Sequence, residues 1–137
     1  LPLLESAALD AGLADKAQRV SAINEVVGLL GRLAAHPLQA EIEAAQERYH
    51  ELPYTRLAGD HAETGYIDLV YRTGDLWHIV DFKTDFIDNE DRKNALVEEY
   101  TPQLRRYQQV VEEMLGVNAD SRICFLDDKG KICLKSI

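Results

Sequence analysis

The fold is decided by one stretch of the sequence, residues 76–84 (LWHIVDFKT). Its residues are mostly β-branched, aromatic or aliphatic, and turn residues at 73–75 precede it, so the stretch predicts a β-strand. Apolar residues on both faces are typical of a central strand that helices cover on each side. Asp81 and Lys83 are the exceptions. Because they stand two residues apart in a strand, they project from the same face, and such a charged pair on a covered strand indicates a functional role.

Further strands are predicted on both sides of this stretch. The segments 52–58 (LPYTRLA) and 64–72 (TGYIDLVYR) have a strand-like composition and are separated by Gly59-Asp60, so we expect a three-stranded meander. Near the end of the chain, RICFL and KICLK flank a turn at residues 127–130 and predict a β-hairpin. Cys124 and Cys133 lie in these strands, either as cross-strand neighbours or one place out of register. We expect both thiols to be reduced and packed.

Helices are predicted around the strands. From residue 15 to residue 35 the apolar residues recur in steps of three and four, which predicts an amphipathic helix packed on a core. These residues are Ala17, Val20, Ile23, Val27, Leu30 and Ala34. Pro37 suits the first turn of a second helix over residues 37–50. The acidic stretch 85–94 predicts a mobile loop before a third helix from about Ala95 to Leu115, which Gly116 ends. The order ααβββαββ predicts an α/β fold with a mixed central sheet flanked by helices.

The composition fits one domain with one core, because 46% of the 137 residues are hydrophobic and no linker is evident. No apolar run approaches the ~20 residues of a membrane-spanning helix, and no signal-peptide pattern begins the chain, so we expect a cytoplasmic protein without membrane contact. Two cysteines are too few for a four-thiolate iron–sulfur cluster. The net charge of −9 argues against broad nucleic-acid binding, although carboxylates that hold divalent cations contribute to an acidic balance.

Three side chains on the predicted meander suggest a metal-dependent reaction. Asp68 lies on the strand before Asp81, and the turn between the two strands can place these carboxylates side by side. Two such carboxylates can anchor Mg²⁺ or Mn²⁺, with the backbone carbonyl of Phe82 as a further ligand. A cation held in this way supplies much of what phosphodiester cleavage requires. Lys83 would orient or deprotonate the attacking water, or neutralise the transition state.

Four motifs in a fixed order carry a resemblance to a known family. They are ELPY (51–54), GYIDLV (65–70), VDFKT (80–84) and QL followed by Tyr107 (103–107). Together they resemble the PD-(D/E)XK nucleases, specifically their RecB/AddA-like branch. The resemblance implies a restriction-endonuclease-like core and a Mg²⁺-dependent deoxyribonuclease of the exonuclease V type. It also implies that Asp68 and Asp81 are metal ligands, that Lys83 is the catalytic lysine, and that Gln103 and Tyr107 lie near the site and the DNA strand.

The same resemblance implies a larger parent protein. Such domains lie at the C-terminus of UvrD/Rep-type superfamily 1 DNA helicases, which act on DNA ends in recombinational repair and bind ATP in their helicase part. The implied partners are DNA, the helicase domains of the same chain and a second helicase-nuclease subunit. Family members also carry a histidine ligand in a GxxxH motif at the start of a helix, and none of the helices predicted here begins with this motif. We therefore expect residues 1–137 to be one nuclease domain truncated at its N-terminal side, and weakly active or inactive in isolation.

Structural roles for the same residues stay open beside the catalytic ones. Asp81 with Lys83 could form a solvated salt bridge on an exposed strand, and Asp68 could serve at a strand end or turn. Glu51 could pair locally at a helix–strand junction or place a carboxylate near the metal, and Tyr107 fits the apolar helix face as well as a site. For the whole domain, one alternative is a nuclease-like fold that no longer cuts and binds DNA ends or braces the motor. Another is a protein-interaction module built on the N-terminal helices, which leaves the strand charges without a role.

Overall fold

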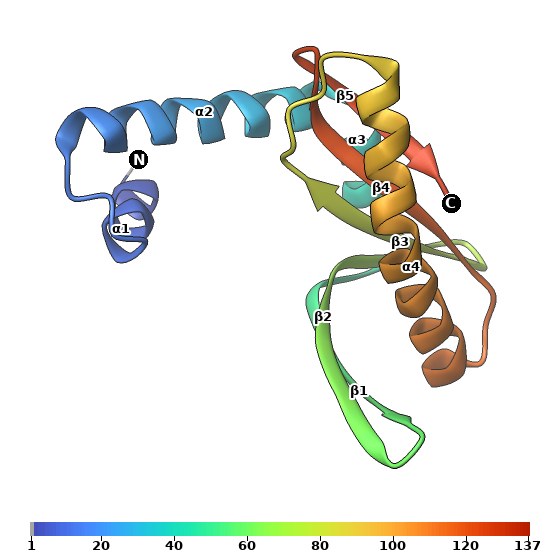
Figure 1. Ribbon diagram of the computed structural model, residues 1–137. Helices are drawn as coiled ribbons and strands as arrows, with labels where there is room; N and C mark the ends of the chain where they lie inside the picture. Colours follow the sequence, from blue (N-terminus) through green and yellow to red (C-terminus); the bar gives the residue numbers. More distant parts are fainter. Residues whose placement is uncertain (1) are drawn as a thin grey trace.

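The computed structural model describes residues 2–137 and has the element order αααβββαββ (Figure 1). The helices are α1 (Pro2–Asp10), α2 (Lys16–Ala35), α3 (Pro37–Ala44) and α4 (Glu90–Leu115). The strands are β1 (Glu47–Ala58), β2 (His61–Thr73), β3 (Leu76–Lys83), β4 (Ala119–Asp128) and β5 (Lys131–Ser136). The expected α/β architecture is confirmed, and α1 adds one helix to the predicted order.

The five strands form one mixed sheet in the order β1-β2-β3-β4-β5. Strands β1 to β3 form the predicted antiparallel meander, and β4 and β5 form the predicted hairpin. Strand β3 pairs with β4 in parallel, which requires a crossover connection, and α4 supplies it. Strand β3 therefore lies in the middle of the sheet, as its two apolar faces predicted.

Each face of the sheet carries its own hydrophobic cluster. One cluster lies between the sheet and α4, which crosses the sheet in Figure 1. Its fully buried members from β3, α4 and β4 include Ile79, Leu104 and Ile123. The other cluster joins the opposite face to α3, where Leu38 and Ile42 are buried. The molecule is thus layered as helix, sheet and helix, and its central strand is covered on both sides.

Helix α2 does not pack along its length on the core, so that expectation was wrong. It projects from the sheet, with α1 beside its far end (Figure 1). Of the residues on its predicted buried face, only Ile23 is buried, whereas Val20, Val27 and Leu30 are 48%, 40% and 53% exposed. Only the last turns reach the sheet, where the Arg32 guanidinium donates to the carbonyl of Leu126 at 3.0 Å. The apolar period of α2 is real, but most of its face has no partner in residues 2–137.

Helix α3 is shorter than predicted. Pro37 begins it as expected, but it ends at Ala44 rather than at His50, and residues 47–50 belong to β1. The cause is Arg48, whose guanidinium donates to the carbonyls of Ile42 at 3.2 Å and Glu43 at 2.8 Å. These bonds give the carbonyl groups of the last helical turn additional donors, beside the Ala45 amide that donates to Ile42 at 3.2 Å, so the chain can leave the helix and pair with β2.

The acidic connection before α4 is shorter and more ordered than the predicted mobile loop. Helix α4 begins at Glu90 because the side chain of Asn89 accepts a hydrogen bond from the Arg92 amide at 2.8 Å, which is an N-cap. Ile87 is fully buried, and its amide donates to the carbonyl of Asp127 at 3.0 Å. The connection is therefore fixed to the end of β4. Gly116 ends α4 with a φ of 65°, as the sequence predicted.

The two cysteines lie one place out of register in the closing hairpin. Cys124 pairs with Leu134, and Cys133 pairs with Phe125. Both thiols are free; Cys124 is buried and Cys133 is half-buried. Burial raises the pKa of the Cys124 thiol to about 12, so this group packs as a neutral side chain.

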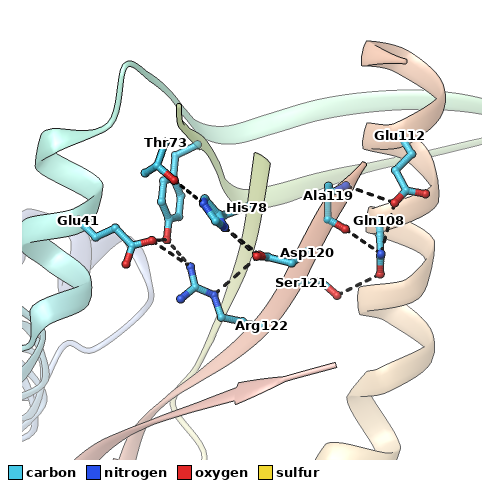
Figure 2. Close-up of polar contacts among 10 residues, drawn as sticks. Glu41, Thr73, His78, Gln108, Glu112, Ala119, Asp120, Ser121 and Arg122 are labelled. Carbon is cyan, nitrogen blue, oxygen red and sulfur yellow. Dashed lines mark hydrogen bonds and ion pairs between the residues drawn. The ribbon is translucent and has the colours of Figure 1, made fainter. Parts of the chain in front are cut away.

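A polar network connects the sheet to α3 (Figure 2). The hydroxyl of the buried Tyr71 donates to the Glu41 carboxylate at 2.8 Å, and the Arg122 guanidinium contacts both groups. Tyr71 lies on β2, Arg122 on β4 and Glu41 on α3. The network therefore links three elements. It also gives hydrogen-bond partners to the Tyr71 hydroxyl, which would otherwise be buried without one.

A second set of polar contacts joins β4 to β3 and to α4 (Figure 2). His78 is buried on β3, where its Nδ1 lies 2.9 Å from the Asp120 carboxylate and its Nε2 lies 2.7 Å from the Thr73 hydroxyl. The Gln108 side chain on α4 donates to the carbonyl of Ala119 at 2.8 Å. These bonds fix β3 relative to β4 and α4.

Within residues 2–137, none of the helices combines the length and apolarity that a membrane crossing requires.

Candidate active site

The ladder between β2 and β3 ends where the two predicted metal ligands stand. Its last pair is Leu69 with Val80, so Asp68 and Asp81 occupy the next position on their strands. Residues that face each other in an antiparallel pair project from the same side of the sheet. At this position a side chain replaces the ladder bond, because the Phe82 amide donates to Asp68 Oδ2 at 2.9 Å. The two carboxylates thus meet at the end of the ladder.

Asp81 is the buried carboxylate of the pair, with an exposed fraction of 3%. Its Oδ2 lies 2.8 Å from Lys83 Nζ in an ion pair and has no well-aligned hydrogen bond with any described residue. Burial raises the pKa of the Asp81 carboxyl from 3.8 to about 6; Lys83 opposes this rise, and the charge of Asp68 adds to it. The Asp81 carboxyl therefore binds a proton more readily than an exposed aspartate does, and the negative charge of Asp68 makes its ionised form less favourable.

Lys83 is held by two residues of α4 in addition to Asp81. Its Nζ donates to Gln103 Oε1 at 3.0 Å and lies 4.1 Å from the centroid of the Tyr100 ring. Tyr100 and Gln103 stand three residues apart on the helix and so share one side of it. The Tyr100 hydroxyl in turn donates to Asp85 Oδ2 at 2.9 Å. The ammonium group thus has a carboxylate, an amide oxygen and an aromatic face around it.

Tyr107 lies on α4 one turn beyond Gln103, where it is part of the core and also close to the carboxylates. It is buried and makes an edge-to-face contact with Tyr54, with ring centroids 6.0 Å apart. Burial raises the pKa of the Tyr107 hydroxyl to about 12, and the negative charges of Asp81 and Asp68 add to the rise. The side chain therefore stays a neutral phenol beside two acidic groups. Tyr107 both packs in the core and lies near the carboxylates, so the structure is compatible with each of the two roles that the sequence left open.

Glu51 lies level with Asp68 but forms no side-chain hydrogen bond or ion pair with the other site residues in the described part of the chain. Strand β1 pairs with β2 on either side of it, at His50 with Leu69 and at Leu52 with Ile67. Glu51 itself is exposed and has a φ of 50°, a left-handed conformation that is uncommon for a residue other than glycine. For Phe82, whose backbone carbonyl is a predicted metal ligand, the structure shows that the amide group donates to Asp68 Oδ2 at 2.9 Å.

Two residues beside the site were not predicted as part of it. Tyr100 was not singled out, although its position three residues before Gln103 on a helix was a usable signal. Asp85 falls in the stretch that the sequence predicts to be a mobile acidic loop. No sequence pattern shows that it reaches the Tyr100 hydroxyl, because that contact depends on how α4 packs against the end of β3.

The carboxylates fit a hard divalent cation, although they offer few ligands. Among residues 2–137, no group of three or more His, Cys, Asp and Glu side chains is placed to hold a metal ion. Mg²⁺ is nonetheless commonly bound through one or two carboxylates while it keeps several waters. The buried Asp81 Oδ2, which no aligned hydrogen bond satisfies, is the observation in favour of the fit. Asp68 and Asp81 would hold the ion.

Comparisons with known proteins identify the family of this chain. Ten chains of solved structures are significantly similar; one is the protein VC1899 from Vibrio cholerae, with 16% identity and a TM-score of 0.44. That match covers 93% of this chain and 33% of the other, so this chain spans about a third of that protein. A search of curated protein sequences found no significant match. The sequence model of the PD-(D/E)XK nuclease superfamily matches residues 3–133. The chain therefore belongs to the PD-(D/E)XK nuclease superfamily.

Proposed function

We propose that this chain is a metal-dependent deoxyribonuclease domain that hydrolyses phosphodiester bonds. The observation that supports this most directly is the meeting of Asp68 and Asp81 at the end of the β2–β3 ladder, with Lys83 Nζ 2.8 Å from Asp81. A salt bridge that served only stability would not need a second carboxylate beside it, because this carboxylate makes the ionised form of Asp81 less favourable. A cation bound between the two acids would remove that repulsion.

Each residue of the site has a separate task in this proposal. Asp68 and Asp81 bind Mg²⁺ or Mn²⁺, which when bound activates water and neutralises charge on the phosphate. Asp81 has to be ionised for this task, and its pKa of about 6 places the loss of binding in mildly acidic solution. Lys83, held by Gln103, directs its ammonium group at the phosphate oxygens, where negative charge increases in the transition state. Tyr107 stays a neutral phenol beside the carboxylates.

We further propose that the domain belongs to a helicase-nuclease that processes DNA ends in recombinational repair. The motifs ELPY, GYIDLV, VDFKT and QL with Tyr107 support this finer assignment. The net charge of −9 gives the domain little electrostatic attraction for a phosphate backbone. This charge suits a domain to which helicase domains of the same parent deliver the strand, since the domain then need not bind DNA tightly itself.

One observation favours a second candidate function. Because no third carboxylate, histidine or cysteine joins Asp68 and Asp81 in residues 2–137, the metal site is sparse. A domain with such a site could bind DNA ends or brace the motor without cutting. The intact pair of acids with Lys83 argues for the nuclease, since a domain that only binds DNA does not need a buried carboxylate of raised pKa.

A cleavage assay with end-labelled linear DNA separates the two candidates. The full-length gene product is incubated with single-stranded or double-stranded DNA and Mg²⁺ or Mn²⁺, and Lys83→Met is compared with Lys129→Met in the exposed β4–β5 turn. We expect metal-dependent cutting that Lys83→Met reduces by at least about 100-fold and Lys129→Met leaves unchanged. Cutting that survives both Lys83→Met and Asp81→Asn would contradict the proposed site. DNA binding without cutting in the full-length gene product would favour the second candidate.

A further inference from the structure

Two residues outside the proposed reaction machinery lie next to Lys83: the Tyr100 ring contacts its ammonium group, and Asp85 accepts a hydrogen bond from the Tyr100 hydroxyl. We propose that Tyr100 is a positioning residue for Lys83 and that Asp85 fixes the orientation of the Tyr100 ring. The inference rests on the proposed function, because it assigns a purpose to the placement of Lys83. It concerns contacts of 4.1 Å between Lys83 Nζ and the ring centroid and 2.9 Å between the Tyr100 hydroxyl and Asp85 Oδ2.

Lysine needs such support because its side chain is long and flexible. Fixing the rotatable bonds between the ammonium and the backbone costs on the order of 2 kcal/mol of conformational entropy. The ion pair with Asp81 uses Oδ2, an oxygen of the carboxylate that is also expected to bind the metal ion. A carboxylate shared with a cation attracts the ammonium less strongly. The contacts from Gln103 and Tyr100 do not depend on Asp81, so they can keep Nζ in place when Asp81 binds a cation.

The aromatic face is suited to this role because the ring is held at both ends. A cation over the face of an aromatic ring is attracted by the electron density of that face. Tyr100 belongs to the partly buried residues that pack on the α4 cluster, so its position on the helix side is set by packing. Burial is the largest cause that raises the pKa of the Tyr100 hydroxyl to about 12, and the hydrogen bond to Asp85 is the second. The phenol thus remains neutral and continues to donate to Asp85.

Asp85 can anchor the ring because its own segment is fixed. It follows the end of β3 by two residues, and two residues later Ile87 is fully buried. The Ile87 amide donates to the Asp127 carbonyl at 3.0 Å, and the Lys129 amide donates to the Ile87 carbonyl at 2.9 Å. The carboxylate of Asp85 therefore starts from a backbone that is hydrogen-bonded to the end of β4. It is not part of a freely moving loop.

A spectroscopic test examines the placement without any reference to cleavage. Protons above an aromatic ring are shifted upfield by the ring current, so the ε-methylene protons of Lys83 should resonate upfield of those of the other lysines. We expect Tyr100→Leu to abolish this shift, Tyr100→Phe to keep it and Asp85→Asn to reduce it. The matched control is Tyr49→Phe, which removes a phenol bonded to the Glu47 carboxylate at 3.1 Å near the start of β1. That variant should leave the Lys83 resonances unchanged.

Cleavage kinetics then test whether the placement matters. We expect Tyr100→Leu to lower kcat about 3- to 30-fold with little change in KM, as is usual for loss of an interaction that acts on the transition state. Tyr100→Phe should retain most of the activity, and Tyr49→Phe all of it. A loss of kcat equal in Tyr100→Phe and Tyr100→Leu would overturn a role for the aromatic face.

The outcomes distinguish this inference from the proposed function. If the wild-type ε-methylene protons of Lys83 show no upfield shift, the positioning role is overturned, whether or not the chain cuts DNA. If the shift is present and depends on Tyr100 while Lys83→Met still cuts normally, the positioning geometry stands and the proposed role of Lys83 fails. A shift that persists in Tyr100→Leu variants that retain a folded circular dichroism spectrum would also overturn the inference.

Discussion

Replacing Asp81 by asparagine should stabilise the fold at neutral pH, although it removes a proposed metal ligand. The pKa of this carboxyl rises from 3.8 to about 6, mainly because the side chain is buried. At about 1.36 kcal/mol per pKa unit, keeping the group ionised in the native state costs on the order of 3 kcal/mol. An asparagine side chain avoids this cost but leaves part of its amide without partners, which offsets about 1–2 kcal/mol. We therefore expect a net gain of about 1–2 kcal/mol in the free energy of unfolding.

The pH dependence of this gain tests the cause. Because the folded-state pKa is raised, the native protein binds more protons than the unfolded chain between pH 3.8 and about 6. The wild type should therefore lose stability relative to Asp81→Asn as the pH rises through this window. Urea unfolding followed by circular dichroism at about pH 4 and about pH 7.5 measures the difference, which should be small at the lower pH. The control is Asp60→Asn, a fully exposed carboxylate whose replacement should change nothing. An Asp81→Asn variant no more stable than the wild type at neutral pH, or equally stabilised at both pH values, would refute this reasoning.

Three further predictions concern the site and the core. In calorimetric titrations, the affinity for Mn²⁺ should decrease as the pH is lowered below about 6, because protons then compete with the cation for Asp81. An affinity that stays constant as the pH is lowered through this value would contradict the proposed site. Gly65→Ala should lower the free energy of unfolding by about 1–3 kcal/mol in urea titrations, because the new Cβ would lie 2.7 Å from the Tyr54 hydroxyl. Leu30→Gln should change the thermal midpoint little, because Leu30 is 53% exposed, whereas Leu38→Ala should lower the free energy of unfolding by about 2–5 kcal/mol. A large loss of stability in Leu30→Gln would show that the apolar face of α2 is covered.

The sheet could be predicted from the sequence because strand signals are local. The strand-like composition and the turn residues located β2 and β3, and the apolar residues on both faces of β3 placed it at the centre. Helix ends were less predictable. Arg48 ends α3 through bonds to carbonyl groups that precede it in the chain, and a helical pattern that continues to His50 does not reveal them. The apolar stripe of α2 shows that one face is apolar, but not what would cover it.

The candidate site shows the same division between local and tertiary information. Asp81 and Lys83 lie two apart on one strand, so their common face follows from strand geometry alone. The position of Asp68 next to Asp81 required only the β2–β3 turn. Tyr100 and Asp85 required the packing of α4 on β3, which no local spacing encodes.

The projecting position of α1 and most of α2 has a consequence for how the molecule opens. The residues buried in the two clusters of the sheet all come from α3 onward, and α2 adds only the partly buried Leu29 and Leu33. Unwinding of the chain before Leu29 would therefore expose little additional apolar surface to solvent. Amide protons there should exchange with solvent by local fraying, while those of β3 should exchange only when the whole domain unfolds. Proteolytic trimming of this region should leave the acidic pair and its lysine in a folded remnant.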